Sequence, residues 1–250
     1  MTAFITYDSG LKTGTKYLTH ETAFFLGGIY AANEHVSSAG KSYWAAPVRY
    51  NPTYSTSLQT TNHFDFISKI SEMVNGYTVM KENIVGTHLD SGKNRLPGFS
   101  TFFESTGLDD LNNSIPSLKK ALQISPDSVK KAFILGVIDG RGTPDVSVEK
   151  GIIRYLSLDC PTNEIGVFFD DVFSGYGLEC NYNTSRDRLE GGNPRKPQFR
   201  IKSVGYYMKN IGYISPAKFK KLSDTYDACY GTHTEYDGSN FLPGLKYLTR

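Results

Sequence analysis

The residues with the clearest chemical potential lie in a polar, glycine-rich turn that follows an apolar segment. The stretch AFILGVIDGRGTPDV, residues 132–146, brings Asp139, Arg141 and Asp145 close together in the chain. Carboxylates are ligands for hard divalent cations, and an arginine holds anions through charge-assisted hydrogen bonds. The same residue types also end helices without further chemistry. The residue types alone leave a metal site, an anion site and a simple helix end open.

A second group of candidate residues is basic and lies in the C-terminal half. Residues 182–209 contain seven lysine and arginine residues against two acids, whereas the whole chain has a net charge of +2. In PQFRIKS, residues 197–203, a period of two places Gln198, Arg200 and Lys202 on one strand face. These residue types hold phosphates or read guanine and adenine edges. The predicted DNA-binding residues here are Arg186, Arg188, Arg195, Lys196, Gln198, Arg200 and Lys202.

The N-terminal half carries a smaller basic set on a predicted strand, residues 41–51, and in a turn, residues 90–98. Its candidate DNA-binding residues are Lys41, Tyr43, Arg49, Lys93 and Arg95. A charged, solvated face is also common in antiparallel sheets that bind nothing.

Other chemistry has little support in the sequence. The five histidines and three cysteines match no metal-ligand spacing, and the glycine-rich turn lacks the lysine of a phosphate loop. No signal peptide is recognisable at the N-terminus, and no apolar run approaches the roughly 18 residues of a membrane helix. We therefore expect a cytoplasmic protein without a membrane partner.

An internal repeat indicates which elements position these residues. ETAFFLGGIYAANEHV, residues 21–36, aligns without a gap with KKAFILGVIDGRGTPDV, residues 130–146, at a separation of 108 residues that pairs Gly28 with Gly136. Small side chains would let two such helices approach closely. These small residues are Gly27, Gly28, Ala31, Ala32, Gly136 and Gly140.

The elements expected after each repeat are similar in order. Those of the first half are strands at 41–51, 77–89 and 97–105, a helix at 62–76, and a closing helix at 108–124 broken at Pro116. Those of the second half are strands at 145–150, 152–160, 178–186 and 197–204, a helix at 161–177 and late helices at 203–224. Each half is interpreted as αββαββα, which predicts an α+β fold with halves at 1–118 and 126–224 and an extension at 225–250.

The duplicated segments, with these surroundings, resemble the two halves of a single-chain LAGLIDADG homing endonuclease. The resemblance covers about residues 15–224, although the specific motif is only about ten residues per half. It implies that the motif helices pack together at a pseudo-twofold axis and that both antiparallel sheets form a saddle on double-stranded DNA. It also implies an acid that binds a divalent metal ion at the foot of each motif helix.

The motifs depart from the family at those acids. Laid on the family motif, LGGIYAANE (26–34) and ILGVIDGRG (134–142) place Asn33 and Arg141 at the two metal-binding positions. A guanidinium is no metal ligand, so Mg²⁺ would need carboxylates from neighbouring positions. Glu34 and Asp139 are the main candidates, and Asp145 is a further alternative. The candidate catalytic residues are Asn33, Glu34, Asp139 and Arg141, with Glu34 and Asp139 as candidate metal ligands.

The resemblance implies a monomer that binds double-stranded DNA and leaves three hypotheses. The first is a site-specific homing or restriction-like endonuclease that uses Mg²⁺. The second is a non-cleaving DNA- or RNA-binding relative, such as a maturase or regulator, in which Arg141 replaces the metal. The third is an unrelated α+β protein without a nucleic-acid partner.

Overall fold

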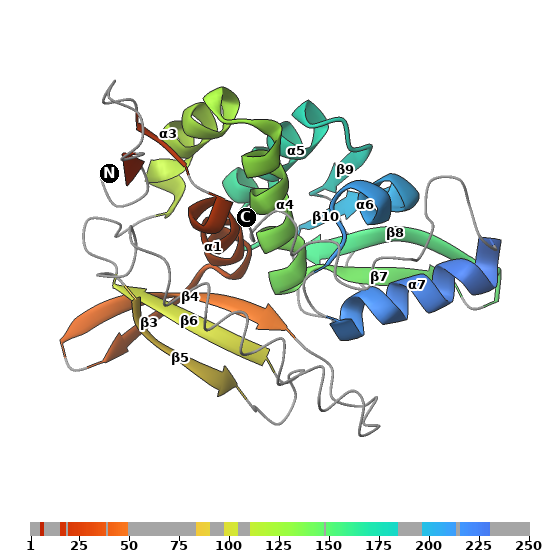
Figure 1. Ribbon diagram of the computed structural model, residues 1–250, viewed down its shortest axis with the longest axis horizontal. Coiled ribbons are helices and arrows are strands. Elements are labelled where there is room, and N and C mark those ends of the chain that lie inside the picture. The colour runs from red at the N-terminus through yellow and green to blue at the C-terminus, as the bar shows by residue number, and fades with distance from the viewer. Residues whose placement is uncertain are drawn as a thin grey trace.

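The protein has the α+β architecture that the sequence predicts. The computed structural model describes residues 6–7, 16–18, 20–38, 40–49, 84–90, 98–104, 111–147, 149–184, 197–213 and 216–230. Two four-stranded antiparallel sheets flank a central pair of helices, α1 (His20–Ala32) and α4 (Asp127–Arg141) (Figure 1). The helix predicted at 62–76 lies outside the described residues.

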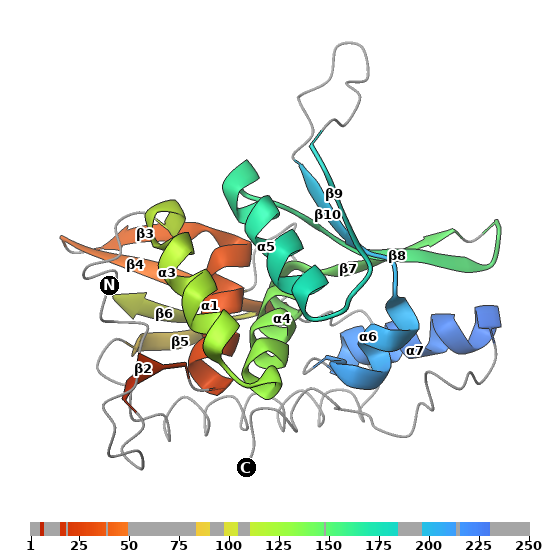
Figure 2. The ribbon, with the colours of Figure 1, turned by 90° about the horizontal axis from the view of Figure 1, so that it is seen from above.

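Helices α1 and α4 lie side by side and pack more extensively on each other than on any other described element (Figures 1 and 2). The contact is between backbones. A Cβ atom placed on Gly27 would lie 2.2 Å from the carbonyl oxygen of Phe133, and one placed on Gly136 would lie 1.9 Å from that of Phe24. The predicted close approach of the two repeated helices through their glycines is therefore confirmed.

These reciprocal contacts define how the two segments correspond. Gly27 matches Gly136 and Phe24 matches Phe133, and each pair is 109 residues apart. The helices end at Ala32 and Arg141 and the following strands begin at residues 34 and 143, with the same spacing. The separation of 108 expected from sequence was thus off by one residue, because Gly27 and Gly28 are adjacent and either one can be aligned with Gly136.

The first sheet follows α1 and has the strand order β3-β4-β6-β5. Its strands are β3 (Glu34–Ser38), β4 (Lys41–Arg49), β5 (Ile84–Asp90) and β6 (Gly98–Glu104). Strand β4 packs against both central helices, and its Trp44 is buried. The sequence pattern did not separate β3 from the helix before it, because that turn is made by Asn33 alone.

The second sheet follows α4 and repeats that order as β7-β8-β10-β9. Its strands are β7 (Thr143–Ser147), β8 (Ile152–Asp159), β9 (Cys180–Asn183) and β10 (Gln198–Ile201). Helix α5 (Asn163–Gly175) covers one face, where the rings of Phe169 and Phe173 contact Phe199. The helix begins at its cap Thr162, whose side chain accepts a hydrogen bond from the backbone N–H of Ile165.

The remaining elements are β1 (Thr6–Tyr7), β2 (Lys16–Tyr17), α3 (Leu111–Ile124), α6 (Val204–Asn210) and α7 (Pro216–Tyr230). Helix α3 continues through Pro116, contrary to the predicted break. A proline in the second turn removes one hydrogen bond, and the buried Leu111 and Leu118 hold the helix on both sides of it.

Helix α7 runs without interruption across the boundary that the sequence predicts after residue 224. Its Leu222 and Tyr226 are both buried, so the helix is held on either side of that boundary. No helix among the described residues is long and apolar enough to cross a membrane.

Candidate nucleic-acid interface

The ends of α1 and α4 bring the repeated motifs together at one place. Asn33 ends α1 with a positive φ of 47°, a conformation that asparagine tolerates better than most residues, and its N–H donates to Ile29 O at 2.8 Å. At the end of α4 the N–H of Gly142 donates to Ile138 O at 2.7 Å. Arg141 therefore corresponds to Ala32 in the structure, and Asn33 corresponds to Gly142.

An ion pair joins the two helix ends. Nη2 of Arg141 donates to Oε2 of Glu34 at 3.3 Å, and both side chains are about one-third exposed, 34% and 33%. Two predicted site residues more than 100 positions apart thus meet, because Glu34 lies just beyond the end of α1, and α1 packs against α4. A pair this exposed contributes about 1 kcal/mol at most to stability.

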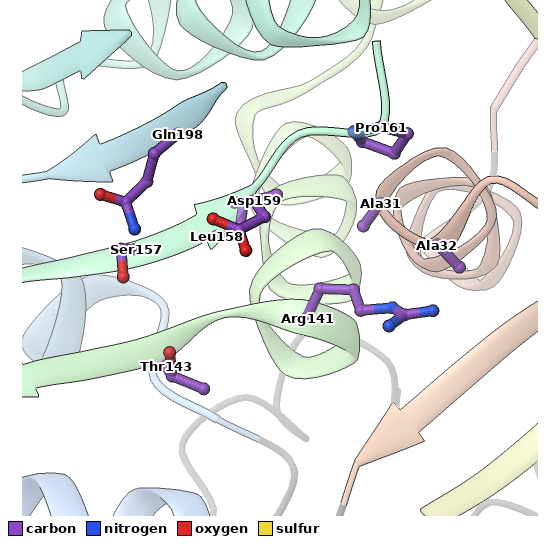
Figure 3. Close-up of a pocket in the computed structure, with 9 residues that line it drawn as sticks. All are labelled: Ala31, Ala32, Arg141, Thr143, Ser157, Leu158, Asp159, Pro161 and Gln198. Atoms are coloured by element: carbon purple, nitrogen blue, oxygen red, sulfur yellow. The ribbon is translucent and has the colours of Figure 1, made fainter. Parts of the chain in front are cut away.

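A pocket of about 340 Å³ opens beside Arg141. Its lining residues are Ala31, Ala32, Arg141, Thr143, Ser157, Leu158, Asp159, Pro161 and Gln198. Figure 3 shows the Arg141 side chain extending from the end of α4 toward α1, with Asp159 and Gln198 on the opposite side of the pocket. The pocket thus joins the helix ends to the second sheet, and it holds a cation, a carboxylate and several neutral hydrogen-bonding groups.

Asp139, the acid that the motif retains, is fully buried in α4. It lies near Tyr213, whose pKa is raised first by burial and further by the charge of Asp139. Asp139 is buried while Arg141 is partly exposed because the two residues are two positions apart in α4, so their side chains point about 200° apart around the helix. Asp139 is not among the residues that line the pocket.

The described residues do not fit the Mg²⁺ site that the resemblance implies. The two equivalent helix ends carry Ala32 and Arg141, the carboxylate of Glu34 faces a guanidinium, and Asp139 is buried. The alternative ligand Asp145 lies 3.9 Å from the Nε of Arg154. Within the described ranges, no three His, Cys, Asp or Glu side chains are grouped so that they could hold a metal ion.

One face of the second sheet is polar along all four strands, and we call it the polar face. Strand pairing places its members on the side opposite Phe199 and α5. They are Thr143, Asp145, Tyr155, Ser157, Asp159, Asn181, Asn183, Gln198 and Arg200. The predicted positions of Gln198 and Arg200 on one face, with Phe199 and Ile201 on the other, agree with their burial.

Arg200 is held in place on this face by two contacts. Its Nε donates to Oε1 of Gln198 at 2.8 Å, and its guanidinium carbon lies 4.5 Å from the ring centroid of Tyr155. Lys202, predicted to share this face, follows β10 and its Nζ lies 3.5 Å from Oε1 of Glu179.

Several predicted binding residues cannot be placed. Lys41, Tyr43 and Arg49 lie on β4, opposite Ser38, Val36 and Gly98 respectively in the strand registers, and only their backbones are described. The others lie outside the described residues: Lys93, Arg95, Arg186, Arg188, Arg195 and Lys196. Their roles stay predictions.

Sequence reasoning missed the pocket and polar-face residues of β8 and β9, including Ser157, Asp159, Asn181 and Asn183. The signal was present in part, since Tyr155, Ser157 and Asp159 alternate with apolar residues in IIRYLSLDC. The sequence does not indicate Asp159 as a site residue, because it is far from Gln198 in the chain. Only strand pairing makes the two residues neighbours.

Among the comparisons with known proteins, only solved structures give matches. No protein-family model and no curated protein matches the chain. Among solved structures, a study of mesophilic variants of the homing endonuclease I-DmoI matches with a TM-score of 0.40 and 10% identity, over 84% of this chain and 95% of that one. I-DmoI in complex with DNA and Ca matches with a TM-score of 0.44 and 11% identity, over 81% and 96% of the two chains. I-DmoI in complex with DNA and Mn matches with a TM-score of 0.37 and 10% identity, over 84% and 96%.

Proposed function

We propose that this protein binds double-stranded DNA as a single chain and does not cleave it through a metal site at the helix ends. Two pseudo-symmetric halves, 1–118 and 126–224 followed by the C-terminal residues, would together present their sheets as a saddle. The common strand order of the two sheets and the reciprocal glycine contacts support this arrangement.

The observation that carries the proposal is the Glu34–Arg141 ion pair between the two helix ends. A guanidinium and a divalent cation 4 Å apart repel each other by about 8 kcal/mol at an effective dielectric constant near 20. The same guanidinium attracts a phosphate and can hydrogen bond to it with two N–H groups. The geometry therefore favours a backbone phosphate over a metal ion beside Arg141.

The polar face carries side chains that could recognise a DNA sequence. Its arginine, glutamine and asparagine side chains are residue types that contact base edges in the major groove, and a β-ribbon fits into that groove. The connection between β9 and β10, residues 184–197, adds the basic residues Arg186, Arg188, Arg195 and Lys196. Basic residues of this kind hold phosphates and determine the register of a protein on DNA.

Binding is tested by titrating a labelled mixed-sequence duplex with the protein at several salt concentrations. Each phosphate neutralised by a lysine or arginine makes the slope of log K against log salt more negative by about 0.9. We expect a steep negative slope. Affinity that does not change with salt, or no binding at low salt, would refute the proposed function.

Cleavage is tested separately by incubating the protein and supercoiled plasmid with Mg²⁺ or Mn²⁺. We expect no nicking. Nicking that depends on the metal and disappears in Glu34→Gln would overturn the non-cleaving part of the proposal and favour the endonuclease hypothesis.

A further inference from the structure

The side-chain amide of Gln198 has a defined orientation. The Nε–H of Arg200 can only donate a hydrogen bond, so the group that it meets at 2.8 Å must be the Gln198 oxygen, as the structure has it. The Nε2 amide group, which carries both donors, therefore points away from Arg200. Gln198 presents N–H donors on the side where it lines the pocket.

This orientation is stabilised before any ligand binds. Arg200 stacks on Tyr155 with its guanidinium carbon 4.5 Å from the ring centroid, and cation–π stacking restricts the guanidinium. Because Arg200 in turn fixes Gln198, little side-chain entropy remains to be lost when Gln198 binds a partner.

Asp159 lies beside Gln198 on the neighbouring strand. The two residues are directly paired in the antiparallel register of β8 and β10, so their side chains share the polar face and both line the pocket. Directly paired residues have Cβ atoms about 5 Å apart. Asp159 contributes acceptors only, so the pair presents a donor and an acceptor next to each other.

We propose that Gln198 and Asp159 form a specificity pair that selects adenine at one position of the bound DNA, an inference that depends on the proposed DNA binding. In the major groove adenine shows an acceptor, N7, beside a donor, the N6 amino group. The Gln198 amide donates to N7 and the Asp159 carboxylate accepts from N6. Guanine and thymine place the acceptors O6 and O4 against Asp159, and cytosine satisfies Asp159 but offers Gln198 no acceptor.

A carboxylate on a DNA-facing surface also lowers affinity for every sequence, because it repels the phosphates. Asp159 should therefore increase specificity and decrease non-specific binding at the same time. This combination distinguishes a base-reading acid from a solvent-exposed acid without a role.

The experiment is binding-site selection from a randomised duplex library with the wild type and Asp159→Ala. Asp227→Ala is the matched control, since Asp227 is an exposed acid on α7. We expect the wild type to prefer adenine at one position over guanine and thymine by roughly tenfold, within the range of a bidentate base contact. Asp159→Ala should lose that preference, keep the rest of the selected sequence and bind random DNA more tightly.

Base analogues at the selected position then assign each contact. Purine lacks the N6 amino group, and should weaken wild-type binding but not binding by Asp159→Ala. 7-Deazaadenine lacks N7, and should weaken binding by both of these proteins but not by Gln198→Leu.

The outcomes separate the two proposals. A wild type that does not bind DNA refutes the proposed function and this inference with it. Salt-dependent binding without a selected sequence, or a sequence whose adenine preference persists in Asp159→Ala, leaves DNA binding in place and overturns the inference. Thermal unfolding of each variant, with an unchanged Tm, excludes misfolding as the cause.

Discussion

The ion pair between Glu34 and Arg141 should weaken DNA binding, because a phosphate must separate the pair to reach the guanidinium. The perturbation is Glu34→Gln, which removes the competing charge and keeps the size of the side chain. If Arg141 binds a backbone phosphate, this variant should bind duplex DNA more tightly than the wild type.

The magnitude follows from the geometry. Two unit charges 3.3 Å apart interact by about 1.3 kcal/mol in water, and measured pairs of similar exposure contribute about 0.2–1 kcal/mol. We therefore expect Glu34→Gln to tighten binding by about 1.4- to fivefold and to lower the free energy of unfolding by less than about 1 kcal/mol.

The assay is the salt-titrated duplex binding described above, applied to Glu34→Gln, Arg141→Met and the double variant. Arg141→Met should weaken binding and reduce the steepness of the salt dependence by about 0.9, the value of one phosphate contact. In the double variant Glu34→Gln should no longer increase the affinity for DNA, since no guanidinium remains to be released from the ion pair with Glu34. Asp171→Asn is the matched control, because it disrupts the exposed ion pair with Lys119 between α5 and α3.

Two results would refute this reasoning. An equal gain from Glu34→Gln with and without Arg141 would mean that Glu34 acts by repelling DNA directly. An unchanged affinity and salt slope in Arg141→Met would mean that Arg141 contacts no phosphate.

Three further predictions concern the framework that holds the site. Gly136→Ala should lower the free energy of unfolding by about 2 kcal/mol or more in urea titrations, because its Cβ would overlap the backbone oxygen of Phe24. The control Gly175→Ala, where a Cβ meets nothing within 4 Å, should not lower it. Thr162→Ala should cost about 1 kcal/mol by the same measurement through loss of the α5 cap, and a cost near zero would show that the cap is dispensable. Burial raises the pKa of the Cys160 thiol to about 12, so at pH 8 it stays protonated and should resist alkylation until the protein is unfolded; rapid labelling in the native state, detected by mass spectrometry, would contradict this.

Several elements of the fold could be predicted because their patterns are local. The apolar stripe of α5 predicted a helix, and Ile165, Phe168 and Phe169 are buried in it. The alternation in QFRI predicted β10 with Phe199 and Ile201 inside. The break predicted at Pro116 was wrong, because the local rule for proline does not include the buried contacts that keep α3 helical on both sides of that residue.

The site was harder to predict because its residues come from separate parts of the chain. Glu34 and Arg141 were both candidates, yet nothing in the sequence indicated that they form an ion pair with each other. Asp159 was not a candidate at all, since it becomes significant only through its pairing with Gln198 across β8 and β10.

The sequence by itself determined that two glycine-bearing segments repeat and that neither ends in the expected pattern of acids. It could not determine the register of the repeat, because Gly27 and Gly28 are equally good partners for Gly136 as residue types. Only the tertiary structure decided the register. Gly27 approaches the backbone of Phe133 and Gly136 approaches the backbone of Phe24, so the two contacts are equivalent when Gly27 is matched with Gly136. That register puts Ala32 opposite Arg141 and places Glu34 within reach of the guanidinium, so that an ion pair joins the two helix ends.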